Sequence, residues 1–179
     1  MIFNDPYKDD YDHRPVKDKK GRFHDEFYYK GELHELPMDE TQKKKASCIH
    51  ILMAVFLIGT AVLPGLMDHP GSHVLWVTLP YVCCFLPAAY FLLGAIEFVT
   101  NGRALTRREY DHSVRRMDRS VTGLIVLSVM NLIIAAVYLI MSGETGEIPY
   151  ILSFLPLAGI SLLRILVQRK EWRLKADPD

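Results

Sequence analysis

The sequence predicts an all-α membrane protein in which four transmembrane helices form two tandem hairpins. Half of the 179 residues are hydrophobic, and most of these gather in four long runs. Two of the three segments that connect these runs, residues 68–73 and 142–148, contain none of the 21 basic residues. A proline-containing segment near residue 80 recurs 69 residues later. Together these features predict membrane spans, their direction and an internal duplication.

The four apolar runs match the length of membrane-spanning helices. A helix needs about 20 residues to cross a hydrocarbon core about 30 Å thick, and lipid offers no hydrogen-bond partners to any other open backbone conformation. The runs cover residues 47–67, about 79–99, 121–141 and 149–167. They divide the chain into a charged, aromatic tail (1–46), a first helical hairpin (47–99), an arginine-rich segment (100–120), a second hairpin (121–168) and a C-terminal tail (169–179).

The distribution of basic residues predicts the orientation. Ten lie in the first 46 residues, six between Arg103 and Arg119, and five from Arg164 onward, whereas loops 68–73 and 142–148 hold none. Cytoplasmic loops carry the excess of lysine and arginine, so we expect both termini and the middle segment in the cytoplasm. No cleavable signal peptide is visible, and we expect a multi-pass protein of the cell (inner or plasma) membrane.

A repeat links the second and fourth spans. Residues 79–89 and 148–158 share six identities in 11 positions, including both prolines of each copy. The repeating unit is therefore a two-helix hairpin. Because each unit starts and ends on the same side, the two copies should be parallel and related by a pseudo-twofold axis along the membrane normal.

The repeated prolines predict where the helices start and bend. Pro80 and Pro149 should occupy the first turn of their spans, where a missing N–H is tolerated. Pro87 and Pro156 lie two turns deeper and should kink their helices. Two interpretations remain open: the kinks shape the bundle, or they form a hinge or a small cavity on the outer side.

Few polar residues lie within the predicted spans. Glu97 and Arg164 fall at similar depths, so they either pair across the pseudo-axis or extend to the interface. Ser128 and Asn131 share one face of the third span, an arrangement typical of contacts between packed helices.

The segments on the basic side suggest a docking surface. Residues 103–120 read as a helix that starts with a capping box at Thr106 and Glu109. Arg22–Tyr29 and Glu32–Leu36 resemble a weak β-hairpin in the tail. We expect the docking surface to comprise Arg107, Arg108, Arg115, Arg116, Phe27, Tyr28 and Tyr29.

Two functional hypotheses follow. The sequence contains no nucleophile elbow, phosphate loop or metal-protease motif, so we expect no enzyme, no cofactor, no metal site and no nucleic-acid binding. The first hypothesis is an accessory or structural subunit of a larger membrane complex; the second is a homo-oligomeric transporter or channel for neutral or apolar cargo. The expected partners are the bilayer, another membrane protein or a second copy, and anionic lipid headgroups.

Overall fold

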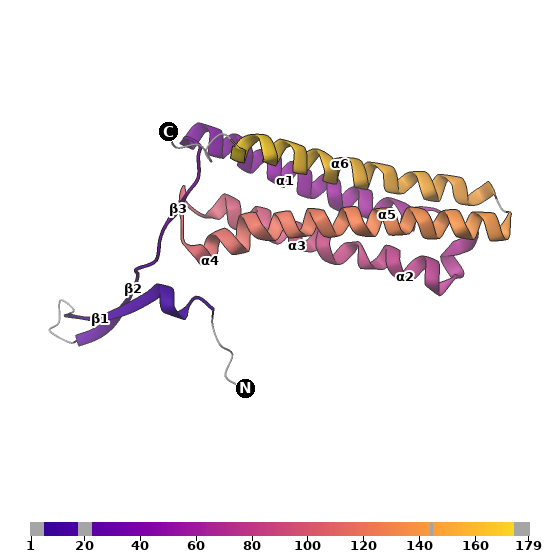
Figure 1. Cartoon of the computed structure of the whole chain (residues 1–179). Helices are drawn as coiled ribbons and strands as arrows, with labels where there is room; N and C mark the ends of the chain where they lie inside the picture. Colours follow the sequence, from indigo (N-terminus) through magenta and orange to yellow (C-terminus); the bar gives the residue numbers. More distant parts are fainter. Residues whose placement is uncertain (1–5, 18–22, 144, 174–179) are drawn as a thin grey trace.

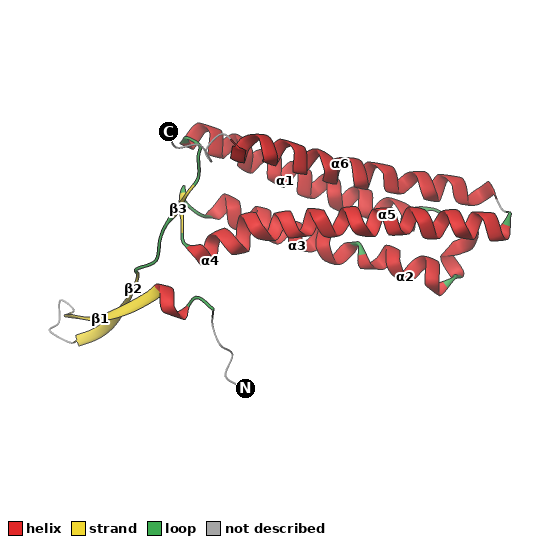
Figure 2. Ribbon diagram, viewed as in Figure 1, coloured by secondary structure: helices red, strands yellow, loops and turns green. Residues whose placement is uncertain are grey.

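The computed structural model describes residues 6–17, 23–143 and 145–173, which form a mostly helical bundle with a strand hairpin at one end (Figures 1 and 2). Four helical segments are long and apolar enough to cross a membrane: Glu40–Leu66, Leu75–Thr100, Arg107–Ser142 and Thr145–Leu166. The predicted number of spans is confirmed, and the chain has the helices of a multi-pass membrane protein. Arg22 of the predicted hairpin and residues 174–179 of the predicted C-terminal tail lie outside the described residues.

The first helix, α1 (Glu40–Val62), begins well before its apolar run. Asp39 caps it: the Asp39 carboxylate accepts the Gln42 N–H at 2.7 Å, and the Gln42 side chain accepts the Asp39 N–H at 3.1 Å. This reciprocal capping satisfies two N–H groups that would otherwise lack partners. A 3₁₀ turn, η2 (Leu63–Leu66), follows α1.

The second span is two helices, α2 (Leu75–Cys83) and α3 (Phe85–Thr100), which follow the 3₁₀ turn η3 (Pro70–His73). The prediction that Pro80 lies in the first turn is wrong, because α2 begins at Leu75 and contains Pro80 in its interior. The helix is interrupted at Cys84, three residues before Pro87. Pro87 has no N–H to offer the Cys83 carbonyl, and α-helical bonding resumes with the Ala88 N–H on the Cys84 carbonyl at 3.3 Å.

The third span continues directly from the arginine-rich segment. It runs through α4 (Arg107–Tyr110), a π-helical turn η4 (Asp111–Arg115) and α5 (Arg116–Ser142). The capping box at Thr106 and Glu109 is confirmed. The predicted helix start at Arg103 is wrong, because Ala104–Leu105 forms a short strand, β4. Gly143, with φ of 70°, ends α5 in a left-handed conformation that glycine adopts readily.

The fourth span, α6 (Ile148–Arg173), follows a 3₁₀ turn, η5 (Thr145–Glu147). Pro149 is its second residue, so it lies in the first turn as predicted. The helix continues without interruption through Pro156. The two copies of the repeated segment therefore differ: the helix is interrupted near Pro87 and continuous through Pro156.

Each long helix packs against two antiparallel neighbours. α1 contacts α3 and α6, and α5 contacts the same two helices, which leaves α1 and α5 at opposite corners. We call the end with the strands the tail end and the end with residues 63–74, 143 and 145–147 the loop end (Figure 1). Large apolar side chains such as Phe56, Leu79 and Ile133 are exposed on the outside. An apolar surface of this extent suits a lipid environment.

The N-terminal tail contributes strands to two small sheets. The first pairs β1 (Tyr11–Lys17) with β2 (Phe23–Tyr29), in register from Tyr11 opposite Tyr29 to Lys17 opposite Phe23. The predicted pairing of residues 22–29 with 32–36 is wrong. Instead β3 (His34–Glu35) pairs with β4. Lys30 and Gly31 therefore do not connect two paired strands. Instead, the Tyr29 ring lies against Gly31, and the Tyr29 hydroxyl donates to the Glu32 carbonyl at 3.0 Å.

Leu36 anchors the tail to the bundle. Its N–H donates to the Arg103 carbonyl at 3.0 Å. Its side chain is buried in the same apolar cluster as Leu105, Phe98 and Val114. The tail is thus attached through both backbone pairing and burial of an apolar side chain.

Candidate functional site

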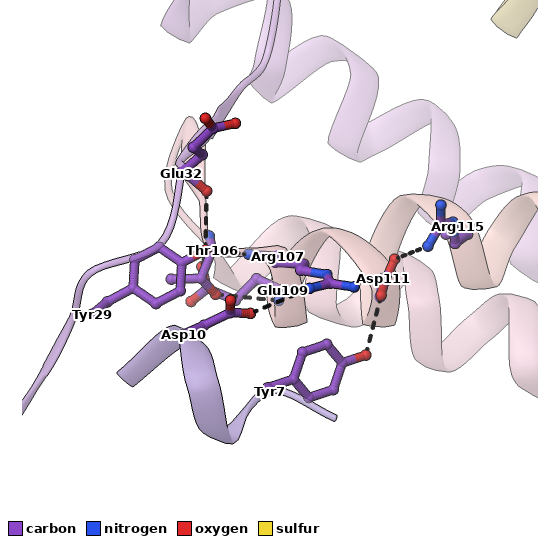
Figure 3. Close-up of polar contacts among 9 residues, drawn as sticks. All are labelled: Tyr7, Asp10, Tyr29, Glu32, Thr106, Arg107, Glu109, Asp111 and Arg115. Carbon is purple, nitrogen blue, oxygen red and sulfur yellow. Dashed lines mark hydrogen bonds and ion pairs between the residues drawn. The ribbon is translucent and has the colours of Figure 1, made fainter. Parts of the chain in front are cut away.

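The candidate site lies at the tail end, where the N-terminal tail meets α4 (Figure 3). Tyr29 connects the two: its hydroxyl accepts the Arg107 N–H at 3.1 Å while donating to Glu32. The Arg107 N–H is one of the groups that a helix start leaves without an internal partner. Asp10 adds an ion pair of 3.9 Å with the Arg107 guanidinium. The strand hairpin is therefore joined to the first turn of α4.

Tyr7 forms a second attachment, deeper along the same helix. Its hydroxyl donates to the Asp111 carboxylate at 3.2 Å, and the other oxygen of Asp111 accepts from Arg115 at 2.7 Å (Figure 3). The Tyr7 ring also meets the His112 ring edge-on, with centroids 6.0 Å apart. Burial and the Asp111 carboxylate raise the pKa of Tyr7 above its ordinary value, so the hydroxyl remains a donor at neutral pH.

Close packing of α3 accompanies the π-helical turn η4. A Cβ atom added to Gly94 would lie 2.9 Å from the Ser113 carbonyl oxygen and 2.8 Å from Met117. Only a glycine admits this approach without displacement of its neighbours. π-helical turns are rare and often occur at functional sites. Here the turn supplies Asp111 and His112, which contact Tyr7 of the tail, and Arg115, which donates to Asp111.

A groove of about 470 Å³ lies between α3 and the η4–α5 segment. Its apolar part is formed by Leu86, Pro87 and Tyr90 of α3. Its polar part comes from the tail and the third span: Tyr7, Asp111, His112, Arg116, Arg119 and Ser120. The Arg116 guanidinium lies 5.8 Å from the centroid of the Tyr90 ring and 3.3 Å from Nδ1 of His112. The groove therefore joins cationic side chains to an apolar floor.

The hairpin β1–β2 projects from the bundle (Figures 1 and 2). Phe23 and Phe27 are on one face of β2 and are 72% and 73% exposed, and Tyr28 on the other face is also exposed. Among the described residues, neither strand pairs with any segment beyond the hairpin. The hairpin thus presents aromatic side chains and unpaired strand edges.

The predicted docking residues separate into two groups. Arg107, Arg115, Arg116 and Tyr29 make contacts within the chain, in the junction and groove described above. Phe27, Tyr28 and Arg108 keep exposed surface, and Arg108 lines a smaller pocket with Glu97. The junction partners Tyr7, Asp10 and Asp111 were missed, since nothing in the sequence shows that residues about a hundred positions apart meet.

The predicted intramembrane polar residues lie on three different helices, α3, α5 and α6. Glu97 of α3 is half-buried and lines a small pocket with Asn101 and Arg108. Arg164 of α6 is buried close to His50 of α1. Ser128 and Asn131 are both buried in α5. The Asn131 amide donates to the Leu127 carbonyl at 2.8 Å and approaches the Cys84 sulfur at 3.5 Å, where α2 and α3 meet.

A buried polar cluster at the loop end was not predicted. Glu147 is fully buried, accepts the Gly71 N–H at 2.6 Å and lies 3.1 Å from Nδ1 of His69. The His69 ring stacks on Tyr150 with centroids 3.8 Å apart. His69 and Glu147 were assigned to separate loops, and the sequence carries no signal that these loops touch. The cluster joins the two hairpins away from the tail.

Comparison with known proteins gave no match: no protein-family model, no curated protein and no solved structure resembles this chain. Its function is therefore inferred from its own residues and their arrangement.

Proposed function

We propose that this protein is an accessory or structural subunit of a larger membrane complex and that its N-terminal hairpin docks the partner. The single observation that carries the proposal is the β1–β2 hairpin, whose base contacts the bundle while its aromatic side chains Phe23, Phe27 and Tyr28 are exposed. Tyr29, Asp10 and Tyr7 hold the base against α4. Phe23, Phe27 and Tyr28 remain at the surface.

The physical chemistry of a lone hairpin supports this assignment. Two-stranded sheets are marginally stable in water unless they pack on another surface. Exposed strand edges readily accept a further strand from a partner, and pockets or rings beside that edge provide specificity. Exposed aromatic side chains are also enriched at the centres of protein interfaces. A partner that adds a strand and covers Phe23 and Phe27 would complete the sheet.

The orientation and the duplication are parts of the same proposal. With both termini in the cytoplasm of the cell membrane, the hairpin faces a cytoplasmic domain of the partner. The distribution of basic residues supports this orientation. The cyclic order of helix neighbours, in which α1 lies opposite α5, is the order expected of two parallel hairpins related by a twofold axis along the membrane normal.

Co-purification tests the docking hypothesis. The protein is extracted from its own membranes in mild detergent, and native mass spectrometry reports any partner at fixed stoichiometry. The variant Phe23→Ser/Phe27→Ser removes two exposed rings from one face of β2 and is expected to lose the partner. The matched control Arg14→Ala/Glu26→Ala removes an exposed ion pair of the same hairpin and should retain it. Equal retention by both variants would contradict docking through this face.

A second candidate function is a homo-oligomeric transporter or channel for neutral or apolar cargo. The observation in its favour is the interruption of the second span at Cys84 beside Pro87, which also lines the groove. A bare homo-oligomer in native mass spectrometry would favour this candidate. The double change Pro87→Ala/Pro156→Ala should then abolish transport in reconstituted vesicles, and unchanged transport would rule out a path along the proline segments.

A further inference from the structure

We infer that the groove between α3 and the η4–α5 segment is a binding site for one anionic phospholipid from the leaflet at the tail end. The inference rests on the membrane-spanning helices and is independent of the proposed docking function. It assigns the phosphate to Arg116 and Arg119 and the first part of the acyl chains to Leu86 and Pro87.

The charge distribution favours an anion. Arg116 and Arg119 line the groove together with His112, whereas Asp111 is the one carboxylate among the lining residues. Asp111 already accepts hydrogen bonds from Arg115 and Tyr7, so its charge is largely compensated. Guanidinium groups form bidentate hydrogen bonds with phosphate oxygens. The Arg119 side chain is exposed and lines the groove, so it is accessible to a ligand that enters from the lipid side.

The depth of the groove favours a ligand with an apolar tail. Pro87 lies against α5 at Gly123, where an added Cβ atom would be 3.6 Å from the proline ring. Arg119 precedes Gly123 by one helical turn, about 6 Å. From Pro87, α3 continues to Thr100, a further rise of about 20 Å toward the tail end. The groove floor at Pro87 therefore lies about one helical turn deeper in the bundle than Arg119, where it can receive the apolar part of a lipid rather than its phosphate.

The size of the groove and its surroundings fit a lipid as well. A volume of about 470 Å³ holds a glycerophosphate headgroup and the first carbons of its chains. Leu86 is exposed to the lipid side, and so are Val82, Leu93 and Leu79 on the same two helices. The remaining acyl carbons can lie along this apolar surface. Tyr7 lines the polar part of the groove beside Asp111 and His112, so the tail contributes a residue to the lipid site.

Lipid titration of the full chain tests the assignment. The protein is purified in mild detergent, depleted of lipid by exchange, and titrated with phosphatidylglycerol or phosphatidylcholine of identical chains, and native mass spectrometry counts the bound molecules. We expect one tightly bound phosphatidylglycerol and no comparable phosphatidylcholine. Equal binding of both lipids would overturn the assignment of an anion site.

Variants locate the site. Arg116→Gln/Arg119→Gln should weaken phosphatidylglycerol binding by about thirtyfold, the loss expected for two basic residues near a membrane surface. The milder Arg119→Gln should weaken it by about fivefold, and because it changes one exposed side chain it serves if the double variant does not fold. The control Arg14→Gln/Lys17→Gln removes the same charge from β1 and should bind normally. Unchanged affinity in both groove variants would overturn the proposal.

A soluble competitor separates the lipid from a free phosphate compound. Glycerol phosphate shares the headgroup chemistry and lacks the acyl chains. We expect it not to displace phosphatidylglycerol at millimolar concentration, and Leu86→Ala to lower lipid affinity without a change of charge. Displacement at equal affinity would show that the groove binds a soluble phosphate compound and would overturn the lipid assignment.

Discussion

The Glu147 carboxylate lies 3.1 Å from Nδ1 of His69, and both side chains are buried at the loop end of the bundle. His69 belongs to the loop of the first helical hairpin and Glu147 to the loop of the second. Because Glu147 also accepts the Gly71 N–H at 2.6 Å, a single side chain connects the 63–74 loop to the start of α6. The contact closes the end of the bundle opposite the tail.

Truncation of Glu147 should therefore destabilise the folded bundle. Glu147→Ala leaves the Gly71 N–H and the His69 ring buried without this partner, and each buried donor left without an acceptor costs about 1 to 3 kcal/mol. Glu147→Gln keeps an acceptor for Gly71 and should cost less. Thermal unfolding in detergent measures both. A melting temperature for Glu147→Ala equal to that of the unchanged protein would show that the contact contributes nothing to stability.

Gly94 provides a steric prediction with a matched control. Gly94→Ala places a methyl group 2.9 Å from the Ser113 carbonyl, so α3 and η4 must separate. Overpacking of this kind costs about 1 to 3 kcal/mol. Gly159 lies in α6, another membrane-spanning helix, and an added Cβ there meets nothing within 4 Å. Gly159→Ala should leave stability unchanged or raise it slightly, and equal destabilisation by the two changes would contradict the close approach at Gly94.

The number of helices and the starts of α4 and α6 could be predicted from the sequence because they depend on local properties. Apolar length predicts the spans, and the Thr106 side chain three residues before Glu109 predicts the start of α4. The hairpin partner of residues 23–29 could not be predicted in this way. Its strand, β1, contains Pro15, and a proline is tolerated there because an edge strand leaves one row of N–H groups unpaired.

For the candidate site, the sequence predicted some of the residues but not the contacts between them. The arginines of the middle segment and the aromatic residues of the tail were identified as candidates, yet their contacts join residues far apart in the chain. Tyr7 and Asp111 are separated by 104 positions, and neither belongs to a motif. The π-helical turn that presents Asp111 and His112 has no sequence signature either, since its residues are compatible with an ordinary α-helix.

Tyr7 predicts how the junction responds to pH. Its pKa is raised above the ordinary value of 10.0 by burial and then by Asp111. The docked tail therefore favours the protonated hydroxyl of Tyr7. The stabilisation of the docked tail by this hydroxyl is fully present below about pH 10 and is lost as the pH rises through the raised pKa. Because amide exchange is itself base-catalysed, the quantity to measure is the protection factor of residues 8–17, which should fall as the pH rises through the raised pKa of Tyr7.

The variant Tyr7→Phe separates this effect from general alkaline unfolding. It removes the hydroxyl that donates to Asp111 and keeps the ring beside His112. We expect lower protection factors for residues 8–17 already at neutral pH and a smaller further decrease on raising the pH. Exchange rates identical to those of the unchanged protein at both pH values would show that the Tyr7 hydrogen bond does not hold the tail.

The two repeated prolines allow a test of whether the break in the second span is caused by Pro87. Pro87→Ala restores an N–H four residues after the Cys83 carbonyl, so α2 and α3 can join into one helix. One added hydrogen bond contributes about 1 kcal/mol, which slows local amide exchange about fivefold. Pro156→Ala makes the equivalent change in α6, which is already unbroken, and should alter exchange there much less. Equal responses at residues 83–88 and 152–157 would mean that the break at Cys84 is imposed by packing against Asn131 rather than by the missing N–H. A hinge would then have to be sought in that contact between α5 and Cys84, and Asn131→Leu would be the change that tests it.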